Sequence, residues 1–166
     1  MSTVHFIMQG KGGVGKTFTA SLLAQYLSDN RGDDALPLRF IDTDPVNATF
    51  SQFRAWPVER LQIQEEGSTR INERRFDDLM EMLLREEADF VIDNGAASFV
   101  PLSNYLTENA AISMLVDAGR RVCVHSVITG GQGLADTING FNQTAAQMPA
   151  DVELYAWLNP YFGKIE

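Results

Sequence analysis

Residues 10–17 read Gly-Lys-Gly-Gly-Val-Gly-Lys-Thr, a glycine-rich stretch that ends in a Lys-Thr pair. It fits the pattern G-x-x-x-x-G-K-[S/T], in which glycines let the backbone curl so that successive N–H groups point at phosphate oxygens. The apolar run Val4–Met8 precedes it as a buried strand, and a helix is predicted from Lys16 to about Ser28. A strand, this loop and a helix in that order predict a site for a nucleoside triphosphate with Mg²⁺.

The end of the loop carries the groups with separate chemical roles. Lys16 is expected to reach the β- and γ-phosphates, and Thr17 to supply its hydroxyl to Mg²⁺. The alternative is a glycine-rich strand-to-helix turn without a ligand, which the Lys16-Thr17 pair and the correct flanks disfavour. The residues expected to contact the nucleotide are Gly12, Gly13, Val14, Gly15, Lys16, Thr17 and Phe18.

Outward from the loop, apolar runs of strand length alternate with helical patterns. Strands that are apolar throughout and separated by helices predict a mostly parallel sheet covered on both faces, a doubly wound α/β fold. In such folds ligands bind at the carboxyl ends of the strands. Further strands are predicted at 38–41, 61–64 (an edge strand), 90–92, 122–128 and 152–158, and further helices at 45–55, 71–87, 101–117 and 134–148.

Two of the predicted helices have apolar faces that can be read from the spacing. In the helix after the loop, Phe18, Leu22, Leu23 and Tyr26 keep the three-and-four spacing of one apolar face. The helix over 71–87 is amphipathic, and its charges are interpreted as a solvated face and not as a binding patch. Its predicted core stripe is Ile71, Phe76, Leu79, Met80, Leu83 and Leu84.

The length, composition and charge limit the class of protein. With 166 residues, 45% of them hydrophobic and 21% charged, the chain is expected to be one globular domain over residues 1–166. No run of about 18 apolar residues exists to span a bilayer, and no secretory signal is visible, so the cytoplasm is the expected compartment. The single cysteine, Cys123, lies in an apolar run and is interpreted as a core residue.

The charge distribution argues for a local polyphosphate site. A formal net charge of −9 disfavours a broad electrostatic grip on nucleic acid or anionic lipid, so no strong nucleic-acid patch is expected. Only three lysines occur, and two of them, Lys11 and Lys16, fall in the glycine-rich loop. An acidic chain that places its scarce lysines there has a local reason to do so, and binding a polyphosphate is such a reason.

Acidic residues follow two of the predicted strands. Asp42-Thr43-Asp44-Pro45 places two carboxylates at a strand end, where they could face a Mg²⁺–triphosphate. For Asp44 a second reading stays open, since Asp before Pro is a good N-cap followed by a first helical residue. Asp93 ends an apolar strand in the Walker B pattern and is expected to hold Mg²⁺ through its water shell. Asn94-Gly95 after it reads as a plain turn.

The loop residues 11–17, Lys-Gly-Gly-Val-Gly-Lys-Thr, resemble the deviant Walker A loop of the ParA/MinD family of ATPases. The resemblance implies a P-loop fold, an ATP-dependent homodimer, and a Lys11 that reaches across to the partner's ATP. It also implies that Asp44 orients or deprotonates the attacking water and that Asp42 helps to position Mg²⁺ through water. The segment Asn94-Gly95-Ala96 would be the switch that senses the γ-phosphate. Asn159 would hydrogen-bond the adenine edge, although Asn159-Pro160 also reads as a turn. Lys11 could instead be a solvent-facing lysine.

Softer segments resemble a narrower branch, the TraL-like (and StbB-like) proteins of conjugative plasmids. The resemblance implies a slowly hydrolysing ATP switch with plasmid transfer or partition proteins as partners, in a chain that normally continues past residue 166. Two alternatives stay open, a nucleotide-gated binding module with negligible hydrolysis and a P-loop enzyme acting on a small molecule. His5 and His125 are expected to be core or near-site residues. The segments that carry this resemblance are residues 4–9, 92–99, 125–132 and 157–163.

Overall fold

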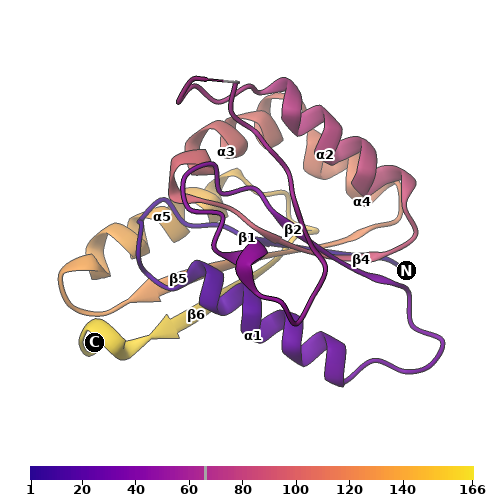
Figure 1. The fold of residues 1–166 in the computed structure, drawn as a ribbon. Helices are drawn as coiled ribbons and strands as arrows, with labels where there is room; N and C mark the ends of the chain where they lie inside the picture. The colour runs from indigo at the N-terminus through magenta and orange to yellow at the C-terminus, as the bar shows by residue number, and fades with distance from the viewer. Residues whose placement is uncertain (66) are drawn as a thin grey trace.

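The centre of the molecule is a six-stranded sheet in the order β3-β2-β4-β1-β5-β6, in which every pair of neighbouring strands is parallel. In this computed structural model, which describes residues 1–65 and 67–166, the helices lie on both faces of the sheet, α1 on one and α2–α5 on the other (Figure 1). The predicted doubly wound α/β fold is therefore confirmed. The strands are β1 (Thr3–Ile7), β2 (Leu38–Asp42), β3 (Val58–Arg60), β4 (Asp89–Asp93), β5 (Arg121–Thr129) and β6 (Glu153–Asn159).

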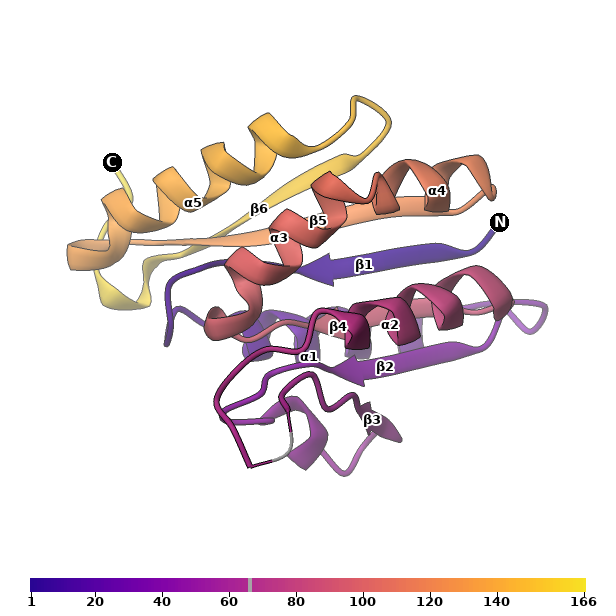
Figure 2. The same ribbon diagram turned by 90° about the horizontal axis from the view of Figure 1, so that it is seen from above.

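The helices follow the strands along the chain, and the view from above shows them running along the strands (Figure 2). They are α1 (Lys16–Asp29), α2 (Arg74–Arg85), α3 (Phe99–Glu108), α4 (Ala111–Asp117) and α5 (Leu134–Gln147). Four short 3₁₀ turns are η1 (Phe50–Gln52), η2 (Ala96–Ser98), η3 (Gly131–Gly133) and η4 (Pro160–Phe162). Among the described residues, no helix is both long and apolar enough to cross a membrane.

Two apolar cores flank the sheet because neighbouring side chains of a strand point to opposite faces. In β1, Val4 and Phe6 belong to the larger core under α2–α4, whereas Ile7 belongs to the smaller core under α1. All three side chains are fully buried. A central strand that is covered on both faces reads as a continuous apolar run, which is why the sequence predicted it.

The predicted apolar face of α1 is wrong for three of its four residues. Phe18, Leu22 and Tyr26 are 63%, 44% and 63% exposed, and Leu23 alone of the four is buried. The buried face is made mostly of small side chains. These buried residues are Lys16, Thr19, Ala20, Ser21, Leu23 and Ala24.

The region between β2 and α2 also differs from the prediction. The helix expected over 45–55 is reduced to the single turn η1, since Ala48 adopts a left-handed φ of 40° that interrupts helical geometry. The edge strand lies at Val58–Arg60 and not at 61–64. Its partner β2 ends at Asp42, whose carbonyl accepts the last ladder bond from the Leu61 N–H (2.9 Å), so the pairing cannot extend further.

The amphipathic helix α2 is confirmed, although it begins three residues later than predicted. Asn72 Oδ1 accepts a hydrogen bond from the Arg74 N–H (3.1 Å), so Asn72 forms a cap before the first turn. The helix predicted over 101–117 is two helices, because Ala110 takes a left-handed φ of 49° between α3 and α4. The Asn109 side chain donates to the Tyr105 carbonyl (3.1 Å) and closes the end of α3.

Candidate nucleotide-binding site

The glycine-rich loop leaves β1 at the carboxyl edge of the sheet and leads directly into α1. Gly13 and Gly15 have φ values of 74° and 103°, a region that side chains with a Cβ rarely occupy. Gly15 is the N-cap of α1, so Lys16 is the first helical residue and the free N–H groups of the first turn face the loop. The backbone path itself therefore favours glycine at positions 13 and 15.

A cavity of about 460 Å³ lies over this loop. Six of the residues expected to contact the nucleotide line it, together with Asp44; Val14 does not. The predicted lining residues are Gly12, Gly13, Gly15, Lys16, Thr17 and Phe18. The sequence reasoning missed the remaining wall, which comes from the loop after β2 and the turn after β4 and consists of Val46, Asn47, Thr49, Ala96 and Ala97.

Lys16 extends back along the loop. Its Nζ donates a hydrogen bond to the Lys11 carbonyl (3.0 Å), and the residue is 8% exposed. Burial lowers the pKa of Lys16, while the carboxylates of Asp93 and Asp44 act in the opposite direction. The loop thus holds a desolvated cation at the wall of the cavity, where an anionic ligand would stabilise it.

Thr17 and Asp93 come together from α1 and β4, as the two motifs predict. Thr17 Oγ1 donates to Asp93 Oδ2 at 2.6 Å. Burial raises the pKa of Asp93 to about 7, although the Thr17 hydrogen bond lowers it and nearby Asp42 raises it further. Among the described residues the other oxygen, Asp93 Oδ1, is buried without a hydrogen-bond partner. A hydroxyl, a carboxylate and an unsatisfied buried oxygen are donors that fit Mg²⁺ with its water shell.

Asp42 and Asp44 occupy different environments. Asp42 is fully buried, and its two oxygens accept backbone N–H groups from Asp44 (3.0 Å) and Ser51 (2.8 Å). Those bonds give Asp42 a structural role in shaping the loop, and its role toward Mg²⁺ stays a prediction. Asp44 lines the cavity, and its Oδ1 accepts the N–H groups of Val46 (2.8 Å) and Asn47 (3.1 Å). These bonds cap a turn, but no helix begins at Pro45, so the helix N-cap prediction is wrong, and the catalytic role stays a prediction.

Lys11 lies on the outer side of the loop. Its Nζ is 2.8 Å from Asp136 Oδ2 in the first turn of α5, and the two side chains are 46% and 59% exposed. Lys11 does not line the cavity around Lys16, but a neighbouring cavity of about 400 Å³ that Gly130 and Phe162 also line. The sequence reasoning missed Asp136, because no sequence spacing links two residues 125 positions apart.

Asn159, at the end of β6, contacts the loop from its far side. Its Nδ2 donates to the Val14 carbonyl (2.9 Å), and its Oδ1 accepts the Tyr161 N–H (3.2 Å). The second bond caps the turn η4, so the turn interpretation of Asn159-Pro160 is confirmed. The expected contact with an adenine edge stays a prediction.

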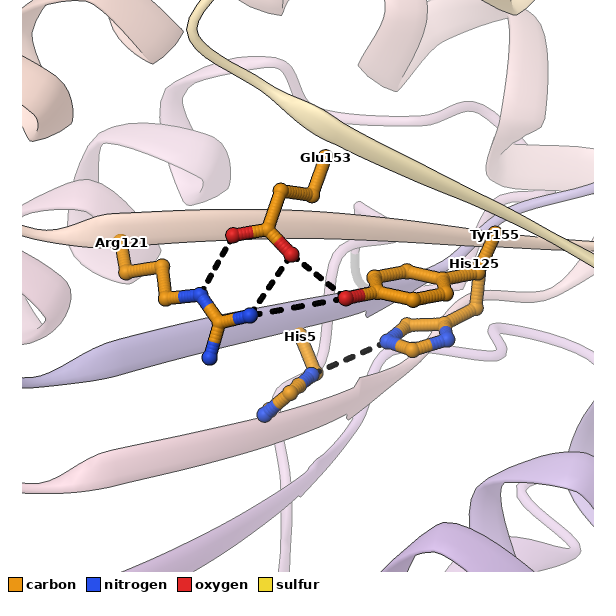
Figure 3. A network of polar contacts seen from close by, with 5 residues as sticks. All are labelled: His5, Arg121, His125, Glu153 and Tyr155. Atoms are coloured by element: carbon orange, nitrogen blue, oxygen red, sulfur yellow. Dashed lines mark hydrogen bonds and ion pairs between the residues drawn. The ribbon is translucent and has the colours of Figure 1, made fainter.

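His5 and His125 form a separate polar network on the α1 face of the sheet, as Figure 3 shows. Trp157 Nε1 donates to His125 Nδ1 (3.0 Å), so a neutral His125 donates from Nε2 to His5 Nδ1 at 2.9 Å. Burial lowers the pKa of His5 to about 4 and that of His125 to about 3. Neither histidine lines the cavity over the loop, so they are buried network residues.

The same network continues toward the amino ends of β5 and β6. Arg121 makes two hydrogen bonds of 2.6 Å to Glu153, and the Tyr155 ring stacks on His125 with centroids 4.9 Å apart (Figure 3). Cys123, on β5 between Arg121 and His125, is fully buried, as predicted for a core residue. Burial raises the pKa of its thiol to about 11.

A Lys-Thr pair at the N-terminus of α1, with an acid at the end of an adjacent strand, defines a P-loop nucleotide-binding domain. The chain belongs to the CobQ/CobB/MinD/ParA nucleotide binding domain family, whose model matches residues 5–157. Over all 166 residues it is 51% and 49% identical to two proteins of Escherichia coli, each named Protein TraL. The chain spans 66% of the length of these two relatives. The predicted membership of the ParA/MinD family and the resemblance to TraL-like proteins are therefore confirmed.

Solved structures agree on the fold. A plasmid partition protein from Borrelia burgdorferi matches with a TM-score of 0.59 at 15% identity, over 96% of this chain and 79% of that chain. The signal recognition particle receptor FtsY from Elizabethkingia anophelis, in complex with GDP, matches with a TM-score of 0.50 at 22% identity. That match covers 86% of this chain and 46% of the receptor. At these identities the likeness establishes the P-loop fold alone.

Proposed function

We propose that this domain binds ATP with Mg²⁺ and hydrolyses it slowly, as a switch that forms a homodimer in the ATP-bound state. The observation that carries the proposal is that Lys16 and Thr17 line one cavity over a glycine loop, with the buried Asp93 hydrogen-bonded to Thr17 behind it. ATP is preferred over GTP because the chain contains no Asn-Lys-x-Asp segment for guanine. The proposed compartment is the cytoplasm.

The chain's own residues divide the work of binding. Backbone N–H groups of the loop and of the first turn of α1 cradle the phosphates, and Lys16 neutralises charge on the β- and γ-phosphates. Thr17 and Asp93 would hold Mg²⁺, directly and through water, respectively. When bound, Mg²⁺ neutralises charge that develops on the phosphate oxygens. Asp44 lies at the wall of the cavity. Its Oδ1 accepts two backbone N–H groups, so its Oδ2 is left to orient the attacking water.

Lys11 supplies the proposed link between two subunits. Its side chain is exposed, its Nζ is bonded only to Asp136 among the described residues, and it does not line the cavity around Lys16. A lysine in that place is available to reach the phosphates of ATP in a second copy. In this proposal the dimer forms over two ATP molecules and separates after hydrolysis.

The process served is proposed from the relatives. The chain is about half identical to two proteins named TraL, and the fold matches a plasmid partition protein. We therefore propose a role in plasmid conjugative transfer or in plasmid maintenance and partition, with proteins of those systems as partners. The relatives are longer than this chain, so we also propose that residues 1–166 are the nucleotide-binding part of a longer protein.

One alternative has a specific observation in its favour. Asp44 Oδ1 caps two backbone N–H groups, and that contact gives Asp44 a structural reason to be present. If capping is its whole role, the domain is a nucleotide-gated binding module with negligible hydrolysis. Both functions require ATP binding, but only the switch hydrolyses ATP at a measurable rate.

The experiment that tests the proposal combines calorimetry of ATP–Mg²⁺ binding with a phosphate-release assay. Lys16→Ala is expected to abolish binding, whereas Lys164→Ala, an exposed lysine at the end of the chain, should leave it unchanged. Asp44→Asn is expected to keep binding and lose turnover, with Asp151→Asn as the exposed carboxylate control. Equal background turnover in wild type and Asp44→Asn would support the binding module. Undiminished binding by Lys16→Ala would contradict both.

A further inference from the structure

Three strand ends meet at the side chain of Asn94, directly after Asp93. Asn94 is 1% exposed, and its Nδ2 donates to the carbonyl of Ile7, the last residue of β1, at 3.2 Å. Its backbone N–H is directed at the same carbonyl (3.3 Å). The glycine loop begins only three residues after Ile7. One amide group therefore ties the end of β4 to the strand that carries the phosphate-binding loop.

The other end of the same amide faces β2. Asn94 Oδ1 accepts a hydrogen bond of 2.7 Å from Thr43 Oγ1, and Thr43 is fully buried. The Thr43 N–H in turn donates to the Asp93 carbonyl (3.0 Å). Thr43 immediately precedes Asp44, so its position sets the start of the Asp44 loop. The bridge runs from Ile7 through Asn94 to Thr43 without a gap.

Gly95 extends the bridge by direct packing. A Cβ added to Gly95 would lie 2.6 Å from Asp44 Cγ and 3.0 Å from Asp44 Cα, distances at which atoms cannot coexist. Asp44 itself closes the cavity opposite the loop, with Ala96 from the same turn as Gly95. The turn after β4 therefore holds Asp44 on one side by contact and on the other through Thr43.

We propose that Asn94 and Thr43 are positioning residues that fix Asp44 relative to the phosphate-binding loop, with Gly95 as the surface on which Asp44 rests. This inference rests on the proposed function. It explains the chemistry of the turn, where Asn94-Gly95 supplies an amide clamp and a space for Asp44. Loss of the clamp lets Asp44 shift, and a small misplacement of a group that orients water lowers turnover far more than ligand binding.

The test uses Thr43→Val, which keeps the shape of the side chain and removes the hydroxyl. Asn94 itself is a poorer target, because its replacement breaks bonds to two strands and endangers folding. Thr43→Val is expected to lower kcat about tenfold with KM and the ATP–Mg²⁺ dissociation constant within about twofold. Thr43→Ser, which keeps the hydroxyl, should have a kcat near the wild-type value. Thr144→Val is the matched control, since Thr144 is a buried threonine of α5 whose hydroxyl bonds the Gly140 carbonyl (3.0 Å).

A second readout does not depend on hydrolysis. Amide exchange at Val46 and Asn47 reports on the capping bonds of Asp44. Thr43→Val should accelerate exchange there at least several-fold, and Thr144→Val at equal global stability should not. The inference is overturned if Thr43→Val matches Thr144→Val in this exchange, or if its kcat stays at the wild-type value. A wild type that does not bind ATP would instead contradict the proposed function. The exchange comparison would then still test whether Asn94 and Thr43 position Asp44.

Discussion

Lys11 Nζ lies 2.8 Å from Asp136 Oδ2, so the first turn of α5 holds the outer lysine of the phosphate-binding loop within its own subunit. If Lys11 serves a neighbouring subunit, this ion pair has to open first. The pair is largely exposed, and exposed pairs contribute about 0–1 kcal/mol to stability. The contact is therefore weak enough to exchange for a phosphate.

Asp136→Asn is expected to favour assembly. Removal of the carboxylate frees Lys11 from the ion pair. The dissociation constant of the ATP-bound dimer should therefore fall several-fold, because assembly no longer has to break a contact worth about 0–1 kcal/mol in each subunit. The melting temperature should hardly change. Sedimentation with ATP–Mg²⁺ measures the dimer, and Glu81→Gln, which opens the exposed Glu81–Arg85 pair of α2, is the control. Weaker dimers in Asp136→Asn than in the control would show that Asp136 presents Lys11 and does not restrain it.

Asp93→Asn should stabilise the nucleotide-free protein at neutral and alkaline pH. The folded pKa of about 7 lies above the ordinary aspartate value of 3.8, so the contribution of Asp93 to stability is present at low pH and is lost as pH rises from about 4 to 7. An amide avoids that loss, and we expect a gain of about 1–3 kcal/mol at pH 8 and little change at pH 4. Urea unfolding across this range measures it. Because the carboxylate is proposed to hold Mg²⁺, the same variant should lose Mg²⁺-dependent ATP binding. A variant less stable than wild type at pH 8 would contradict the raised pKa of Asp93.

His5 and His125 should make the free energy of unfolding depend on pH in the opposite direction. Both folded pKa values, about 4 and about 3, lie below 6.5, so stability is full above pH 6.5 and falls as the unfolded chain takes up protons below it. Each histidine contributes a slope of up to about 1.4 kcal/mol per pH unit between 6.5 and its folded pKa. Urea unfolding is measured across this pH range for two proteins. One carries Asp93→Asn alone, and the other carries Asp93→Asn together with His5→Gln and His125→Gln. Identical pH slopes in the two proteins would show that the pair titrates normally in the fold.

Asn159→Ala separates two roles of the residue at the end of β6. Its bond to the Val14 carbonyl predicts that the variant loosens the loop and weakens ATP and GTP alike, by about 0.5–1.5 kcal/mol for the lost hydrogen bond. Competition binding of both nucleotides measures the effect. A loss confined to ATP would instead support the contact with the adenine edge.

The sequence was most informative where local chemistry determines structure. Gly13 and Gly15 take backbone angles that glycine permits, and Thr17 meets Asp93 because the carboxyl ends of parallel strands share one edge. These features were predicted correctly from the residues and their spacing.

Tertiary packing determined the features that sequence reasoning missed. The apolar spacing in α1 suggested a face with Phe18 and Tyr26, but the face that is buried consists mostly of its small residues. Asp136 meets Lys11 only through the placement of α5, and Thr43 meets Asn94 only through the alignment of β2 with β4. No periodicity or spacing in the chain records such contacts.

We propose that two copies of the chain assemble over ATP through Lys11. Light scattering of the wild type, with and without ATP–Mg²⁺, tests this assembly beside Lys11→Ala and the control Lys164→Ala. We predict that ATP–Mg²⁺ doubles the mass of the wild type and of Lys164→Ala, whereas Lys11→Ala binds ATP and stays monomeric. A wild type that stays monomeric with ATP bound, or an unchanged dimer of Lys11→Ala, would contradict the claim.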